Sequence, residues 1–114
     1  MKNVIQSMLS LEDAAQCFAA LGSEQRLSVL QALVAAGPEG LTAGRLAERT
    51  GIAGSTLTHH LRFLCQSGLI EQERRGRQVI SRAAFQRVEN VSQYLLLNCC
   101  AEATKSHETH ERTL

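Results

Sequence analysis

The chain has 114 residues, of which 44% are hydrophobic and 20% are charged, and its formal net charge is +1. A chain of this length forms one domain with a modest core, which dimerisation would help to stabilise. No segment reaches the roughly 18 apolar residues that a membrane span needs, and Glu12 and Asp13 interrupt the N-terminal region in a way that signal peptides do not show. We therefore expect a cytoplasmic protein with no membrane association, whose four cysteines are reduced.

Although the net charge is small, the basic residues are unevenly distributed. Residues 53–82 hold five arginines against two glutamates, a local net charge of +3. The segments before and after this stretch each carry a net charge of −1. A local basic stretch is typical of a nucleic-acid-binding surface, although a solvated protein face gives the same signal.

Helical periodicity predicts two helices in the first third of the chain. The first covers residues 11–21 and ends at Gly22, and the second covers residues 24–36, with Ser23 as its N-cap and Gly37 beyond its end. The apolar positions expected to face the core are Leu11, Ala14, Ala15, Phe18 and Leu21 in the first helix and Leu27, Leu30, Leu33 and Val34 in the second.

Two further helices are predicted over residues 43–50 and 54–68. Thr42 can cap the shorter one, and Gly51 is expected in a left-handed conformation after it. In the longer helix the apolar stripe consists of Leu57, Leu61 and Leu64. Two short helices joined by a glycine-containing turn are typical of a helix-turn-helix.

The hydrophobic period changes after Gly68. Residues 69–82 read as two short strands around Arg75-Gly76, which predicts a β-hairpin. Residues 83–100 return to helical spacing, and residues 101–114 have no apolar periodicity and are expected to form a flexible C-terminal tail. The apolar side of the last helix is expected to consist of Phe85, Val88, Val91, Leu95 and Leu96.

This order of elements predicts a mostly α (α+β) fold, a winged helix-turn-helix of about five helices plus a two-stranded β-hairpin wing. Residues 1–100 would form the DNA-binding and dimerisation domain, followed by the tail at residues 101–114. The sequence shows no nucleophile–base–orienter set and no phosphate-binding loop, so we do not expect an enzyme.

The helix after Gly54 has the composition of a DNA recognition helix. Short polar side chains near its N-terminus suit contacts with base edges and phosphates in the major groove, and an arginine follows one turn later. The hairpin tip adds three arginines in four residues, which suits the backbone or minor groove of DNA. The candidate DNA-binding residues are Ser55, Thr56, Thr58, His59, His60, Arg62, Arg74, Arg75 and Arg77. His60 adjoins the core position Leu61, so a structural role is at least as well supported for it as a base contact.

The run IAGSTLTHHLRFLCQSGLIEQERRGRQVISR resembles the DNA-binding core of the ArsR/SmtB family of metal-responsive repressors, and LGSEQRLSVLQAL resembles the second helix of that family. The resemblance covers about residues 10–98. It implies a homodimer paired through the first and last helices, which binds double-stranded operator DNA without ligand and leaves it when ligand binds.

Two well-known sensing sites of the family are missing here. The segment LTAGRLAERT has no thiol, and FQRVENVSQYLLL offers Glu89 but no histidine. The sequence Asn98-Cys99-Cys100 instead resembles a subset of arsenical sensors, which implies a trivalent arsenical, methylarsenite or arsenite, as the inducer. Some relatives have a further cysteine shortly afterwards, and this chain has none after Cys100.

Thiolates bind soft, thiophilic ions, and a trivalent arsenical with one carbon substituent needs only two of them. Cys99 and Cys100 are therefore the candidate ligands, with Cys17 as a candidate third ligand for arsenite. Two small thiols can also simply pack in a dimer contact. Cys65 is expected to be a packing residue, and His107 and His110 are weaker candidates for a zinc site with the cysteine pair.

The sequence thus favours a DNA-binding repressor released by a trivalent arsenical. A first alternative is a thiol redox- or persulfide-responsive repressor of the same fold, in which Cys17 links to Cys99 or Cys100. A second alternative is a winged-helix module for protein interaction in which the cysteines are inert.

Overall fold

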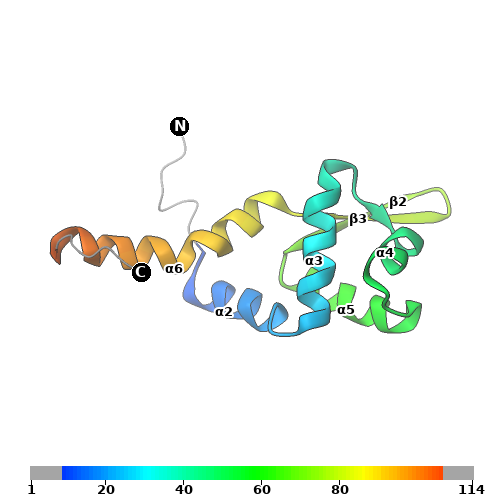
Figure 1. Cartoon of the computed structure of the whole chain (residues 1–114). Coiled ribbons are helices and arrows are strands. Elements are labelled where there is room, and N and C mark those ends of the chain that lie inside the picture. The colour runs from blue at the N-terminus through cyan, green and yellow to red at the C-terminus, as the bar shows by residue number, and fades with distance from the viewer. Residues whose placement is uncertain (1–8, 107–114) are drawn as a thin grey trace.

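The structure is a computed structural model that describes the backbone of residues 9–106 and the side chains of residues 9–97. It consists of α2 (Leu11–Ala20), α3 (Glu24–Ala36), the 3-10 helix η1 (Gly37–Glu39), β1 (Leu41–Thr42), α4 (Ala43–Thr50), α5 (Gly54–Gln66), β2 (Ile70–Arg75), β3 (Gln78–Ala83) and α6 (Phe85–Ser106). In Figure 1, α3 crosses the middle of the molecule, the β2–β3 hairpin projects at one end and α6 extends at the other. The predicted winged helix-turn-helix is confirmed.

The sheet is antiparallel, with strand order β1-β3-β2. Arg75 pairs with Gln78, so Gly76 and Arg77 form a two-residue loop, and Gly76 has the positive φ of 60° that such tight hairpin turns require. The sequence did not indicate β1, because a strand of two residues is too short to show an alternating pattern. By pairing with β3, β1 ties the base of the wing to the end of α3.

Gly40 makes this pairing possible. Its φ is 71°, and a Cβ atom there would overlap the carbonyl oxygen of Ser81 and lie 2.9 Å from Cγ2 of Ile80. The backbone before β1 therefore approaches β3 more closely than any side chain at this position would allow.

The core lies between α3, α5 and the sheet. On α5 the predicted stripe of Leu57, Leu61 and Leu64 is buried. On α3 the prediction is partly wrong, because Leu27 and Val34 are 41% and 39% exposed. The buried face of α3 instead consists of Val29, Leu30 and Leu33.

α2 also faces the core differently from the prediction. Leu11 is 76% exposed and Phe18 is 38% exposed, whereas Ala14, Cys17 and Ala20 are buried. Small side chains let α2 lie close to the rest of the core, and the larger apolar residues remain on the surface of the single chain.

α6 is longer than predicted and only partly packed. It continues past residue 100 to Ser106, because residues 101–106 include no glycine or proline to end it. Residues 107–114, the rest of the predicted tail, lie outside the described residues. Val91 is buried, but Leu95 and Leu96 are each 62% exposed. Within the part of the chain that the structure describes, no helix is long and apolar enough to cross a membrane.

We predict that Gly40→Ala destabilises the protein more than Gly37→Ala. The two residues have nearly the same backbone conformation, φ 71° and ψ −169° at Gly40 and φ 80° and ψ −166° at Gly37, which costs an alanine about 1–3 kcal/mol. Only at Gly40 does the new Cβ meet other atoms, so we expect about 1–3 kcal/mol of additional loss there. Urea unfolding of the two variants measures the difference, and equal losses would show that the close approach of Gly40 to β3 does not constrain the fold.

Candidate nucleic-acid interface

α4 and α5 form the helix-turn-helix. The left-handed Gly51, with φ 74° and ψ 12°, ends α4 as predicted, and its N–H donates to the carbonyl of Ala47. Leu46, Ile52 and Leu57 are buried on the inner side of this unit. Burial of this side fixes which face of α5 points outward. Five of the predicted DNA-binding residues are exposed on α5, namely Ser55, Thr56, Thr58, His59 and Arg62.

The N-terminus of α5 is capped differently from those of the three preceding α-helices. Ser10, Ser23 and Thr42 each accept a hydrogen bond from the first turn of the helix that follows them. At α5 the N-cap is Ala53, which has no side-chain acceptor. The backbone N–H groups of this turn therefore have no side-chain cap, and such groups suit a phosphate oxygen.

The wing presents Arg74, Arg75 and Arg77, all exposed. Glu73 is shared between two arginines, with Arg75 Nε at 3.3 Å and Arg82 Nη2 at 2.8 Å. Hydrogen bonds first from Arg82 and then from Arg75 lower the pKa of Glu73, so it stays ionised. Arg75 is thus partly neutralised, whereas Arg74 and Arg77 make no ion pair with any side chain that the structure describes.

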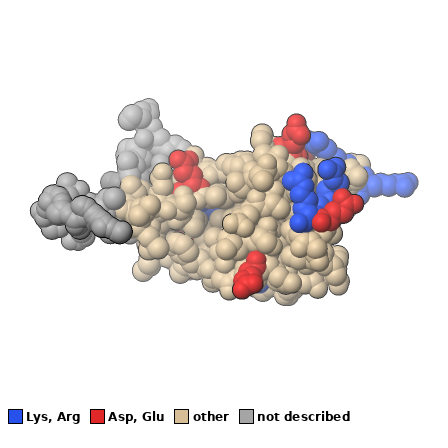
Figure 2. Space-filling view, viewed as in Figure 1, with Lys and Arg blue, Asp and Glu red and all other residues tan. Residues whose placement is uncertain are grey.

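α4 adds two arginines, which were not among the predicted DNA-binding residues, to the basic surface. Arg45 and Arg49 are exposed, and Figure 2 shows basic side chains gathered at the end of the molecule where α4 and the wing lie. Arg45 lies 3.8 Å from Glu48, an exposed pair of little energetic weight. The spacing of four residues between the two arginines was a signal in the sequence, because it places both on one face of a helix.

His60 does not lie with the exposed candidates. It is 8% exposed and points inward, where Gln25 Oε1 accepts a hydrogen bond from Nε2 at 2.7 Å. Its Nδ1 lies 3.5 Å from Nη1 of Arg26, which fits a neutral ring that accepts there. Burial, followed by the charges of Arg26 and His59, lowers the pKa of His60. His60 thus joins α5 to α3, the structural role that the sequence left open.

The predicted sensing residues are only partly described. Cys17 is fully buried, its thiol donates to the carbonyl of Ser67 at 3.3 Å, and burial raises its pKa although Arg87 opposes the shift. Burial also raises the pKa of Cys65, the expected packing residue. Cys99 and Cys100 lie within α6 and not at its end, and their side chains lie outside the described residues.

Both proposed metal sites include side chains that lie outside the described residues. His107 and His110 are outside the described residues, as are the side chains of the cysteine pair. Among the side chains that are described, no group of three or more His, Cys, Asp or Glu residues is placed to hold a metal ion.

A helix-turn-helix followed by a basic wing defines a DNA-binding protein of the winged-helix class, and comparisons with known proteins agree. A helix-turn-helix domain family matches residues 21–73, and no curated protein matches the chain. An ArsR-like transcriptional regulator from Rhodococcus sp. RHA1 is 30% identical in sequence to this protein, with a TM-score of 0.67. The matched region covers 80% of this chain and 82% of the Rhodococcus chain.

Two further solved structures are similar. The homodimeric winged helix-turn-helix DNA-binding domain of Mb0332 from Mycobacterium bovis is 26% identical over 90% of each chain, with a TM-score of 0.62. The transcriptional repressor BigR from Xylella fastidiosa is 26% identical over 78% of this chain and 86% of its own, with a TM-score of 0.60. The protein belongs to the ArsR family of DNA-binding transcriptional regulators.

We predict that His60 makes the stability of the protein depend on pH. Because its pKa is lowered in the folded chain, the unfolded chain takes up a proton first as the pH falls below the ordinary histidine pKa of 6.5. The free energy of unfolding should therefore decrease from pH 7.5 to pH 5.5, and less steeply in His60→Gln. Urea unfolding across this range measures both slopes, and parallel slopes would contradict the role given to His60.

Proposed function

We propose that the protein is a homodimeric repressor that binds operator DNA and leaves it when a trivalent arsenical binds Cys99 and Cys100. The observation that carries the DNA-binding part is that α5 exposes a row of polar residues and that basic side chains gather at the end of the molecule where the wing lies (Figure 2). Membership of the ArsR family supports the regulatory role.

In this proposal α5 enters the major groove and the wing follows the DNA backbone. The hydroxyls of Ser55, Thr56 and Thr58 serve as hydrogen-bonding groups, and Arg62 reaches a phosphate or a guanine. Arg74 and Arg77 interact with phosphates or the minor groove as cations not already paired with a described carboxylate. Arg45 and Arg49 on α4 extend the same electrostatic surface.

A second copy of the chain would cover the apolar surface that α2 and α6 leave exposed. These helices contact each other, and Leu11, Phe18, Leu95 and Leu96 are exposed on them. Large apolar patches on one protomer are typical of an interaction surface. The homodimeric state of the similar Mb0332 domain supports the same assembly for this chain.

The helical backbone at Cys99 and Cys100 suggests how ligand binding acts on DNA affinity. Successive side chains on an α-helix diverge by about 100°, so bringing both sulfurs to one arsenic unwinds α6 locally. Because α6 also carries the exposed leucines, this unwinding alters the dimer contact and the spacing of the two recognition helices. A coupling of about 1–3 kcal/mol would weaken DNA binding roughly 5- to 150-fold.

Methylarsenite fits this proposal better than arsenite. A third sulfur from Cys17 would have to leave a fully buried position and its hydrogen bond to Ser67. Methylarsenite needs only the two thiolates of the vicinal pair.

A second candidate function is a thiol-redox response of the same repressor. It is favoured by the contact between α2, which carries Cys17, and α6. The α6 side chain next to Cys17 is Arg87, about 18 Å along the helix from Cys99, so the link would use the cysteine pair of a second protomer. It is opposed by the raised pKa of Cys17, because a thiol that stays protonated reacts slowly.

Removing Arg77 should weaken DNA binding by the loss of one phosphate contact. We predict that Arg77→Ala lowers the affinity for all DNA sequences and reduces the slope of log K against log salt by about 1. Fluorescence anisotropy with labelled DNA from upstream of the protein's own gene, at several salt concentrations, measures this slope.

Lys105→Ala is the charge-matched control, since residue 105 lies next to the end of α6, at the opposite end of the molecule from the wing (Figure 1). It should leave the salt slope unchanged. If the wild-type protein shows no salt-dependent DNA affinity, the proposed repressor is excluded. The alternative of a winged-helix module for protein interaction is then favoured.

The arsenical proposal predicts release of the protein from the same DNA. Methylarsenite should release wild type but not the double variant Cys99→Ser, Cys100→Ser, and should lower the helical circular dichroism signal of wild type. Zinc should have no effect. Cys65→Ser is the control for loss of a thiol and should respond like wild type.

Other ligands separate the alternatives. Release by arsenite that is lost in Cys17→Ser would add Cys17 as a third ligand. Release by peroxide or persulfide, with a Cys17 link to the pair seen by mass spectrometry, would favour the redox candidate. If the double variant responds to methylarsenite like wild type, the cysteine pair is not the sensor.

A further inference from the structure

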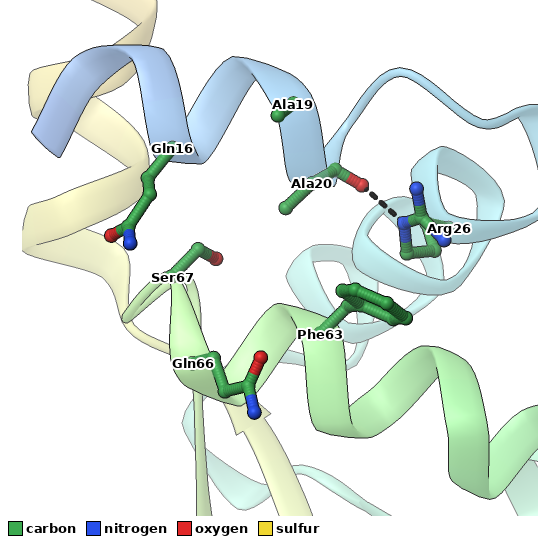
Figure 3. Close-up of a pocket in the computed structure, with 7 residues that line it drawn as sticks. All are labelled: Gln16, Ala19, Ala20, Arg26, Phe63, Gln66 and Ser67. Atoms are coloured by element: carbon green, nitrogen blue, oxygen red, sulfur yellow. Dashed lines mark hydrogen bonds between the residues drawn. The ribbon is translucent and has the colours of Figure 1, made fainter. Parts of the chain in front are cut away.

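A pocket of about 270 Å³ opens between α2, α3 and the C-terminal part of α5 (Figure 3). Its walls are Gln16, Ala19 and Ala20 on α2, Arg26 on α3, and Phe63, Gln66 and Ser67 at the end of α5. The DNA-binding and sensing proposals use none of these side chains. In Figure 3, Gln16 points from α2 toward Ser67, and Phe63 lies beside Arg26.

Arg26 provides a half-buried positive charge at this pocket. Its Nε donates to the carbonyl of Ala20 at 2.6 Å, Nη1 lies 3.5 Å from His60 Nδ1, and the guanidinium carbon lies 4.8 Å from the centroid of the Phe63 ring. These contacts hold the guanidinium in place but use only some of its five N–H donors. Among the described side chains, no Asp or Glu forms an ion pair with Arg26, and Nη2 has no acceptor.

The other polar side chains of the pocket add donors and no negative charge. The amides of Gln16 and Gln66 make no hydrogen bond with another described residue, so each can donate to a ligand. The hydroxyl of Ser67 is already used, because it donates to the carbonyl of Leu64. The lining thus combines one cation, two free amides and no carboxylate, which favours an anion.

The apolar part of the lining restricts the kind of anion further. The ring of Phe63, which is 40% exposed, and the methyl groups of Ala19 and Ala20 offer a surface for an apolar group. A volume of about 270 Å³ is just below the ~300–1,000 Å³ range of small-molecule sites, so the ligand is small. Because Nε donates to Ala20, the donors left on Arg26 are Nη2 and the second N–H of Nη1, and a carboxylate, with one charge and two coplanar oxygens, matches such a pair.

We infer that this pocket binds a small organic carboxylate, with the carboxylate on Arg26 and the amides of Gln16 and Gln66 and its apolar part against Phe63. Because the walls belong to three helices, bound ligand fixes the end of α5 relative to α2 and α3. α5 also carries the DNA-facing residues, so the ligand changes DNA affinity, a consequence that rests on the proposed DNA-binding function.

The test uses benzoate as the probe and benzamide as its uncharged match. Titration of the isotopically labelled full-length chain with benzoate should shift the backbone amide signals of Ala19, Ala20, Phe63 and Ser67 together, along one saturable curve. Benzamide should bind about tenfold more weakly or worse, because it cannot form the charged pair with Arg26.

Variants at exposed positions avoid confusing loss of the site with loss of the fold. Gln66→Leu and Gln16→Leu should each weaken benzoate binding about threefold or more. Gln31→Leu is the matched control, since Gln31 is an exposed glutamine of α3 that does not line the pocket. Arg26→Gln should abolish binding, but it also loses the contact with Ala20, so the glutamine variants carry the test.

Equal affinity for benzoate and benzamide, unchanged benzoate affinity in both Gln66→Leu and Gln16→Leu, or signal shifts confined to the wing would overturn the inference. DNA affinity measured with and without saturating benzoate tests the coupling alone. Benzoate binding without any change in DNA affinity would remove the coupling and leave the site. A chain that binds benzoate but no DNA would refute the repressor proposal and not the pocket.

Discussion

The orientation of α5 depends on the burial of one stripe of leucines. Leu57, Leu61 and Leu64 have at most 6% of their surface exposed, and they pack with Leu30 and Leu33 of α3 in a single apolar cluster. Rotating α5 by one residue would expose this stripe at a cost of about 1.5–3 kcal/mol for each leucine. The polar residues on the opposite face therefore point to solvent as a consequence of core packing, which is what makes α5 a rigid reading element.

Polar contacts also join α3 to α2 and α5. Arg26 reaches the last residues of α2 and the ring of Phe63, and it shares His60 with Gln25. A hydrophobic cluster resists separation of the helices but tolerates small sliding movements, whereas hydrogen bonds require particular distances and angles. The leucines thus hold the helices together, and the Arg26–His60 contacts fix how the helices are aligned.

The elements with a strong local signal were predictable from the sequence. The bounds of α3, the stripe on α5 and the hairpin around Gly76 agree with their predictions. The face of α2 was not predictable, because the helix has two apolar sides, and periodicity cannot say which of them is covered. The role of His60 could not be chosen either, since its partner Gln25 lies on another helix and only the fold brings them together.

The base of the wing has a consequence for the DNA that this protein prefers. Arg82 holds Glu73 on one side and donates to the carbonyl of Pro38 on the other, which joins the hairpin to the end of α3. These contacts restrain the base of the hairpin relative to α5, so in the proposed complex the duplex would supply part of the matching curvature and groove width. Flexible or narrow-grooved steps beneath the wing would then be favoured even where no side chain reads a base, and the preferred sites would be defined in part by how easily they bend.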